Sequence, residues 1–156
     1  MFFSNISAMT IHYFAYGSNM SMDKLRGHAP SSIHLATGYL SRWQLGLNKK
    51  GHDGLGRATI HPEAGGKVWG VVYQMSHSDK EALDKVEGLG KGYREQEVEV
   101  VSVSGLVYHA LTYVGIRLAD NLHVADWYMK HIIDGAEENN LPAEYISKIK
   151  SYVTKT

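Results

Sequence analysis

The alternation of apolar and polar positions predicts a chain that is rich in strands over its first two thirds. Residues 43–48 alternate with a period of two, which is typical of a half-buried strand. Residues 68–73 are apolar on both faces and are expected to form a central strand. Further strands are predicted at residues 11–16, 33–39, 58–60, 93–103 and 106–114, the last two joined by a hairpin turn at Ser104-Gly105.

One short helix is predicted between these strands. Residues 78–81 (S-D-K-E) form a capping box, which marks its start. Leu83 and Val86 are expected to face inward, and Gly88 is the residue type that ends a helix.

The last third of the chain is predicted to be helical. A second helix begins at Pro142, a residue that is common at helix starts. The helix before it presents an apolar stripe made of Trp127, Ile132, Ile133 and Ala136. Strands first and helices last, with hairpins between, favour an α+β fold over a parallel βαβ sheet.

The chain is expected to form one domain. No repeat, low-complexity tract or linker divides it, so residues 11–156 are assigned to a single domain large enough to bury a proper core. Residues 1–10 are expected to be disordered or an extra extension, with Met9 favoured over Met1 as the natural start. Residues 49–56 contain three glycines and are predicted to form a mobile loop.

Composition excludes several classes of function. Sixteen basic residues balance sixteen acidic ones, so bulk charge gives no case for binding nucleic acid or an anionic membrane. No apolar run approaches the roughly 20 residues of a membrane helix. The chain has no cysteine, which excludes disulfides and thiolate nucleophiles and fits a cytoplasmic protein. Nine histidines occur without H-E-x-x-H or a tight cluster, so no metal site is predicted.

Residues 16–19 (Y-G-S-N) follow a predicted strand and precede a helix start at Ser21. Such a turn exposes backbone N–H groups that can hold a carboxylate or an oxyanion. Ser18 is not expected to be a nucleophile, because the G-x-S-x-G pattern is missing. An ordinary turn with a capping serine explains this segment equally well.

Glu87 is the candidate for proton transfer. It lies in the last turn of the predicted helix, where a negative charge is disfavoured by about 0.3–1 kcal/mol. With apolar Val86 and Leu89 beside it, this placement favours the protonated carboxyl and suits a general acid/base. The alternative is a solvated glutamate at a frayed helix end.

Several segments resemble the γ-glutamylcyclotransferase family. Residues 13–20 (Y-F-A-Y-G-S-N-M) are similar to the family's opening signature. Residues 83–88, followed by Gly92-Tyr93, are similar to its catalytic-glutamate segment. The resemblance runs in order from about Ile11 to Lys150 and also includes residues 58–60 and 68–72 as central strands and residues 135–139 and 141–145 as C-terminal helices.

The resemblance implies a small mixed β-barrel flanked by helices and a specific reaction. The α-amine of a γ-glutamyl amino acid or peptide attacks its own γ-carbonyl, which gives 5-oxoproline and releases the amino acid. The resemblance makes Glu87 the general base and acid, and it implies no cofactor and no metal. The substrate-binding residues implied are Tyr16, Gly17, Ser18, Asn19, Met20, Tyr93, Tyr113 and Tyr128, with Tyr16 more structural than the others.

The expected partner is therefore a small γ-glutamyl substrate, with no nucleic acid and no membrane, and a homodimer is left open. Glutathione-specific relatives tend to carry Y-G-S-L and γ-glutamylamine cyclotransferases Y-G-T-L. The Ser18-Asn19 pair departs from both, so the leaving group stays open. Two other functions also stay open: removal of a γ-glutamyl group from a biosynthetic intermediate or carrier, and non-catalytic binding of a small anion.

Overall fold

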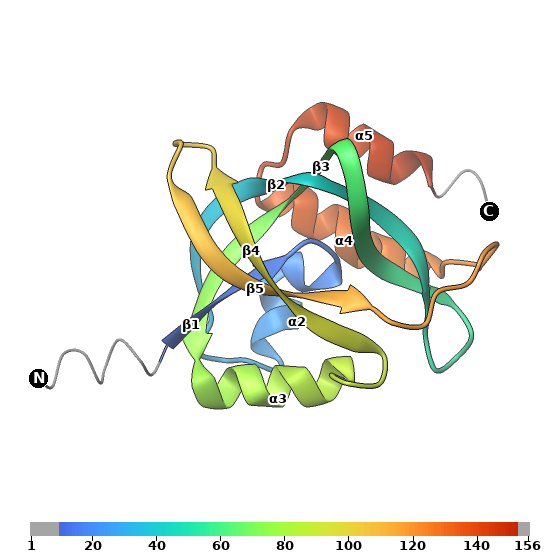
Figure 1. Cartoon of the computed structure of the whole chain (residues 1–156), viewed down its shortest axis with the longest axis horizontal. Coiled ribbons are helices and arrows are strands. Elements are labelled where there is room, and N and C mark those ends of the chain that lie inside the picture. The colour runs from blue at the N-terminus through green and yellow to red at the C-terminus, as the bar shows by residue number, and fades with distance from the viewer. Residues whose placement is uncertain (1–9, 153–156) are drawn as a thin grey trace, which may run out of the picture.

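The computed structural model describes residues 10–152, and in this part of the chain five strands close into a barrel. The strand order around the barrel is β1-β3-β2-β4-β5, with every neighbouring pair antiparallel except β1 and β5. The strands are β1 (Thr10–Ala15), β2 (Ile33–Lys50), β3 (Gly56–Ser76), β4 (Tyr93–Ser102) and β5 (Val107–Gly115). The predicted α+β class and mixed barrel are confirmed (Figure 1).

The start of the chain bears on one expectation. Residues 1–9 lie outside the described part, so the predicted N-terminal extension stays a prediction. Thr10, which the sequence assigns to that extension, is the first residue of β1 and pairs with Ser76.

β2 and β3 are much longer than predicted, because each merges two segments that the sequence separates. The two strands pair over most of their length, and register shifts interrupt the ladder between Ser41 and Trp43 and between Gly46 and Lys49. Arg42 has φ of 69°, so a bulge bends β2 there. The loop predicted for residues 49–56 is present but shorter than predicted: its ends belong to the strands, and residues 51–55 form the connection.

β1 and β5 form the seam of the barrel. Their parallel register is recorded at Tyr13 and Leu111. Side chains add bonds across the seam: Thr112 Oγ1 donates to the Phe14 carbonyl at 2.8 Å, and the Tyr16 hydroxyl donates to the Tyr113 carbonyl. Tyr16 therefore has a structural contact beneath its loop.

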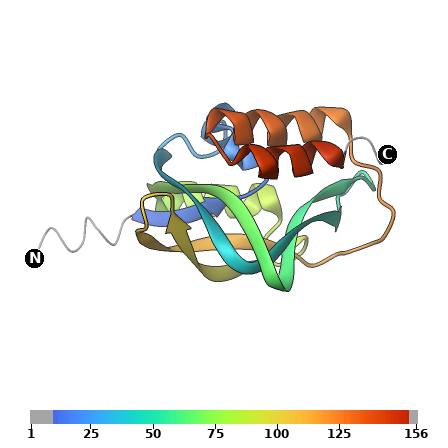
Figure 2. The same cartoon turned by 90° about the horizontal axis from the view of Figure 1, so that it is seen from above.

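Helices lie against the barrel on different sides (Figures 1 and 2). α4 and α5 run side by side, and η1 packs on α4 at Gly135, where an added Cβ would lie 2.8 Å from the Met20 Cβ. No helix in residues 10–152 is long and apolar enough to cross a membrane. The helices are η1 (Ser18–Met20), α2 (Met22–Arg26), α3 (His77–Glu87), α4 (Asp126–Glu138) and α5 (Ala143–Ser151).

The start of α3 differs from the prediction, whereas its end agrees. Ser76 is the N-cap, and its side chain accepts a hydrogen bond from the Asp79 N–H at 3.1 Å. The N-cap is therefore Ser76 rather than Ser78, and the helix begins at His77. Gly88 ends it in the left-handed conformation, with φ of 70°, as the sequence predicts.

One member of the predicted apolar stripe of α4 does not face the core. Ile132 and Ala136 are fully buried, whereas Trp127 is 54% exposed. Its neighbour Tyr128 is the first buried residue of α4 instead. Because successive residues are rotated by about 100° around a helix, Trp127 then points away from the core. The Arg57 guanidinium lies 5.3 Å from the Trp127 ring centroid and covers part of this face.

Candidate active site

A cavity of about 710 Å³ lies where the C-terminal end of α3 faces the turn after β1. This volume is within the usual range of small-molecule sites. Its tyrosines are Tyr13, Tyr16, Tyr93, Tyr113 and Tyr128. Its basic residues are Lys24, Lys49, Lys50, Arg57, Lys91 and Arg117, and its only carboxylates among the described residues are Asp53 and Glu87. Cations outnumber carboxylates, so the cavity suits a small anionic ligand.

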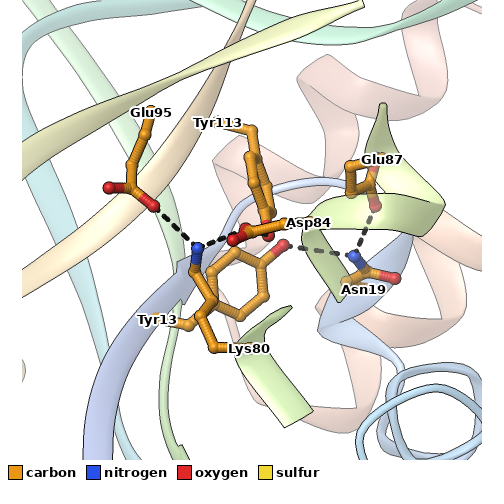
Figure 3. Close-up of polar contacts among 7 residues, drawn as sticks. All are labelled: Tyr13, Asn19, Lys80, Asp84, Glu87, Glu95 and Tyr113. Carbon is orange, nitrogen blue, oxygen red and sulfur yellow. Dashed lines mark hydrogen bonds and ion pairs between the residues drawn. The ribbon is translucent and has the colours of Figure 1, made fainter. Parts of the chain in front are cut away.

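Glu87 and Asn19 meet at the centre of this site (Figure 3). Asn19 Nδ2 donates a hydrogen bond to Glu87 Oε1 at 2.9 Å and another to the Tyr13 hydroxyl at 3.2 Å. The left-handed turn at Gly88 ends α3 directly after Glu87, so the carboxylate stands at the helix end. The two segments that the sequence singles out are thereby joined.

Lys24 fixes the orientation of the Asn19 side chain. Its Nζ donates to Asn19 Oδ1 at 3.1 Å. An ammonium group can only donate, so the amide oxygen must face Lys24 and the amide NH₂ must face Glu87. Burial lowers the pKa of Lys24, and the charge of Glu87 opposes this effect.

A second polar network lies one turn earlier on α3 (Figure 3). Lys80 is buried, and its ammonium donates to Asp84 Oδ1 and, at 2.8 Å, to Glu95 Oε2. The Tyr113 hydroxyl also donates to Asp84 Oδ1, at 2.6 Å. Glu95 thus ties β4 to α3.

Tyr93 and Tyr128 hold one backbone position from two sides. The Tyr93 hydroxyl donates to the Ala58 carbonyl at 2.8 Å, and the Tyr128 hydroxyl accepts from the Ala58 N–H at 2.9 Å. Ala58 in turn faces Gly17, where an added Cβ would lie 3.0 Å from the Ala58 Cβ. The turn at Gly17 is therefore packed against a wall that these tyrosines brace.

The tyrosine hydroxyls stay protonated at neutral pH. Burial raises the pKa of Tyr128 to about 12 and raises the pKa of Tyr13, Tyr93 and Tyr113 further. Tyr13 accepts its bond from Asn19, so its own proton is available to another acceptor. Tyr13 thus offers a neutral hydrogen-bond donor beside the Glu87 carboxylate.

The predicted site residues, with one exception, line this one cavity. They are Tyr16, Gly17, Ser18, Asn19, Glu87, Tyr93, Tyr113 and Tyr128. Met20 does not line it: its side chain is fully buried, and its carbonyl accepts from the Tyr73 hydroxyl at 2.7 Å. Val86, predicted to face inward, is 52% exposed, because it lies beside the cavity rather than in the core.

Sequence reasoning missed the basic residues of the cavity and the Lys80–Asp84 pair. Lysines and arginines at strand ends resemble ordinary solvated residues, and only the fold brings Lys49, Arg57 and Arg117 to one cavity. One signal was available for Lys80 and Asp84, since opposite charges four residues apart on a helix face each other. Residues 10–152 contain no group of three or more histidine or acidic side chains that could hold a metal ion.

The chain is similar to a known protein family and to curated proteins. The model of the AIG2-like family matches residues 67–149. The γ-glutamylcyclotransferase of Mus musculus is 32% identical over 150 residues, which cover 91% of this chain and 78% of the mouse protein. That of Homo sapiens is 34% identical over 147 residues, with coverage of 89% and 77%.

A solved structure gives the same result. A γ-glutamyl cyclotransferase of 31% sequence identity superposes with a TM-score of 0.84 and covers 90% of this chain and 86% of its own. This chain belongs to the γ-glutamylcyclotransferase family.

Proposed function

We propose that this protein is a cyclotransferase that converts a γ-glutamyl amino acid or peptide into 5-oxoproline and releases the free amino acid. One observation of the structure carries the proposal: the Glu87 carboxylate is held by Asn19 at 2.9 Å inside a cavity lined by basic residues and tyrosines. The names of the relatives support the same activity.

The nucleophile of this reaction is part of the substrate. A bond forms between the α-nitrogen and the γ-carbonyl carbon, and the bond from that carbon to the departing nitrogen breaks. The ring has five members, so holding the glutamyl chain folded supplies much of the entropic advantage. The chemistry required of the protein is therefore proton transfer and stabilisation of the carbonyl oxygen.

Glu87 is proposed to move the protons. The α-nitrogen loses protons on becoming a lactam nitrogen, and the departing nitrogen gains protons on becoming an amine. A single carboxylate between the two nitrogens accepts from the first and donates to the second. A positioned group of this kind contributes roughly 10²–10⁴ to the rate. Asn19 keeps one oxygen of Glu87 occupied, which sets the direction of the carboxylate.

The turn after β1 is proposed to bind the glutamyl half of the substrate. Gly17, Ser18 and Asn19 line the cavity directly opposite Ala58, in a turn whose first N–H groups have no partner within the helical turn itself. Tyr13 adds a neutral donor beside Glu87, because its hydroxyl accepts from Asn19 and keeps its own proton, and such a donor suits the negative charge that develops on the attacked carbonyl oxygen. A binding pocket alone would not require a carboxylate in this position.

The test is a panel of γ-glutamyl compounds incubated with the purified protein, with 5-oxoproline measured by chromatography. Formation of 5-oxoproline in equal amount to the released amino acid supports the proposal. Release of glutamate instead would show hydrolysis and overturn it, since water would then be the nucleophile. Binding of the panel without any turnover would favour the alternative of a small-anion-binding module.

The cysteine-free composition suits a reducing compartment, and we extend the proposal to a cytoplasmic enzyme. Fractionation of cells that express the protein at its natural level would test this location.

A further inference from the structure

Lys49 has a largely buried stem and presents its ammonium group to the cavity. The residue is only 7% exposed, and its ammonium lines the cavity together with Glu87 and Tyr93. Within residues 10–152 it takes part in no ion pair and no side-chain hydrogen bond; its recorded contact is the Tyr93 ring, 4.6 Å from Nζ to the centroid. The ammonium is therefore open to the cavity, where it can donate charged hydrogen bonds to an anionic group of a ligand.

The surroundings of Lys49 are shaped to hold its long side chain in place. An added Cβ at Gly115 would lie 2.7 Å from Lys49 Cγ, and one at Gly92 would lie 2.9 Å from Nζ. These two glycines lie at the open end of the β4–β5 hairpin, where Tyr93 pairs with Gly115, and they leave the space that the lysine fills. The stem is fixed between them, and the charge is directed to one place.

The other basic residues of the cavity are less suited to this task, because Lys50, Lys91 and Arg117 are exposed, and Arg57 and Lys24 already have partners. Arg57 is paired with Asp53 at 2.9 Å and stacks 4.9 Å from the Tyr128 ring centroid. Lys24 donates to Asn19 and serves the orientation of Glu87. Among these three cations, Lys49 is the one whose polar hydrogens are all available to a ligand in the described part of the chain.

Lys49 and the turn after β1 reach the cavity from different strands of the barrel. Gly17 follows β1 and packs on Ala58 of β3, whereas Lys49 belongs to β2, on the other side of β3. A γ-glutamyl amino acid carries a carboxylate at each end, with the reacting amide between them. A substrate whose glutamyl end occupies the turn therefore has a second carboxylate that a cation elsewhere in the cavity can bind.

We propose, on the basis of the cyclotransferase function above, that Lys49 binds the carboxylate of the departing amino acid and so determines the choice of leaving group. The enzyme then prefers γ-glutamyl amino acids to γ-glutamyl amines, which lack that carboxylate. Burial lowers the pKa of Lys49, whereas the negative charge of Glu87 raises it, and a bound carboxylate would also favour the charged ammonium.

The experiment compares two substrates in one variant. Lys49→Met keeps the apolar stem between Gly92 and Gly115 and removes the charge. We expect kcat/KM for γ-glutamylalanine to fall by roughly 10–100-fold, as for a lost hydrogen bond between charged groups, while kcat/KM for γ-glutamylethylamide changes by less than about twofold. The ratio of the two values does not depend on the fraction of folded enzyme. Lys49→Gln provides a second variant should methionine prevent folding.

Lys67→Met is the matched control, because Lys67 also lies over a tyrosine, 4.2 Å from the Tyr39 centroid, but outside the cavity. It is expected to leave both substrates unaffected. An equal fall for both substrates in Lys49→Met would show that the lysine serves the glutamyl half, and no change for either would show that it binds no substrate carboxylate; both overturn the proposal. If the wild-type protein forms 5-oxoproline from neither compound, the cyclotransferase function itself fails.

Discussion

The Tyr113 hydroxyl donates a 2.6 Å hydrogen bond to Asp84 Oδ1, and Asp84 lies three residues before Glu87 on α3. The same oxygen accepts from the buried Lys80 ammonium. The Tyr113 and Tyr13 rings are 5.6 Å apart, so this network reaches the tyrosine that contacts Asn19. The end of α3 is thus held by a carboxylate that lies outside the cavity.

Asp84→Asn is expected to lower both stability and turnover. The change leaves Lys80 with Glu95 as its only recorded anionic partner, and loss of a charged hydrogen bond costs about 1–3 kcal/mol. Urea unfolding measures this loss. The control is Asp134→Asn, whose pair with Lys130 is exposed and should contribute nothing measurable. Equal stability of the two variants would show that the Asp84 network does not anchor α3.

Glu87→Gln is expected to fold normally and to bind a γ-glutamyl ligand, because glutamine keeps the size of glutamate. Its kcat should fall by roughly 10²–10⁴, since the amide cannot accept and return a proton. Glu87→Asp should also be impaired, because a shorter side chain misplaces the carboxylate by about 1 Å. Initial rates of 5-oxoproline formation measure both effects.

Glu138 offers a control for this experiment, since it also is the last residue of a helix but lies outside the cavity. Glu138→Gln should leave turnover unchanged. A well-folded Glu87→Gln enzyme that keeps more than about a tenth of wild-type kcat would contradict the role of Glu87 as general base.

Gly17→Val is expected to damage substrate binding. A Cβ at this position would lie 3.0 Å from the Ala58 Cβ, and Ala58 cannot yield easily because Tyr93 and Tyr128 hold its backbone. The turn must therefore shift, and displacement by about 1 Å can cost up to roughly 10²-fold in kcat/KM. Gly17→Ala should give a smaller loss in the same direction. A folded Gly17→Val enzyme with wild-type kcat/KM would exclude binding by this turn.

Alkaline pH is expected to destabilise the protein through its buried tyrosines. Burial raises the pKa of Tyr128 from 10.0 to about 12, so the unfolded state loses this proton at lower pH than the folded state. The stabilisation is therefore complete below pH 10.0 and is lost as pH rises through about 12. Melting temperatures measured across this range should fall, and Tyr128→Phe should reduce the pH-dependent part of the fall. A flat profile would contradict the burial argument.

The sequence predicted the elements of the fold correctly where local residue preferences and long-range packing favour the same structure. Gly88 ends α3 because only glycine adopts the left-handed conformation without cost, and the hairpin at Ser104-Gly105 has the same origin. Residues 33–50 were divided because the bulge at Arg42 breaks the alternation, although the strand continues through it. Strand length in a barrel is set by the partner strand, which a local pattern does not contain.

The candidate site shows the same division. Asn19 and Glu87 were found because turn and helix-end positions carry a local signal. Their bond to each other, across 68 residues, had no local signal. Lys49 was placed in a loop, because a lysine beside three glycines is typical of solvated chain. Its burial depends on Gly115, which the sequence places 66 residues away and the fold places in contact.

Local opening of the barrel at the seam between β1 and β5 affects the catalytic site. Its parallel register is recorded at a single pair, Tyr13 and Leu111, whereas β2 and β3 are paired along most of their length. Amide protons at the seam should therefore exchange with solvent through small local openings, earlier than those of the long ladder. Tyr13 belongs to both the seam and the site, so each such opening also withdraws the hydroxyl that meets Asn19. The enzyme can thus populate a locally open, inactive state without unfolding. A substrate that bridges the cavity would lower the population of this state and slow the exchange of the seam amide protons.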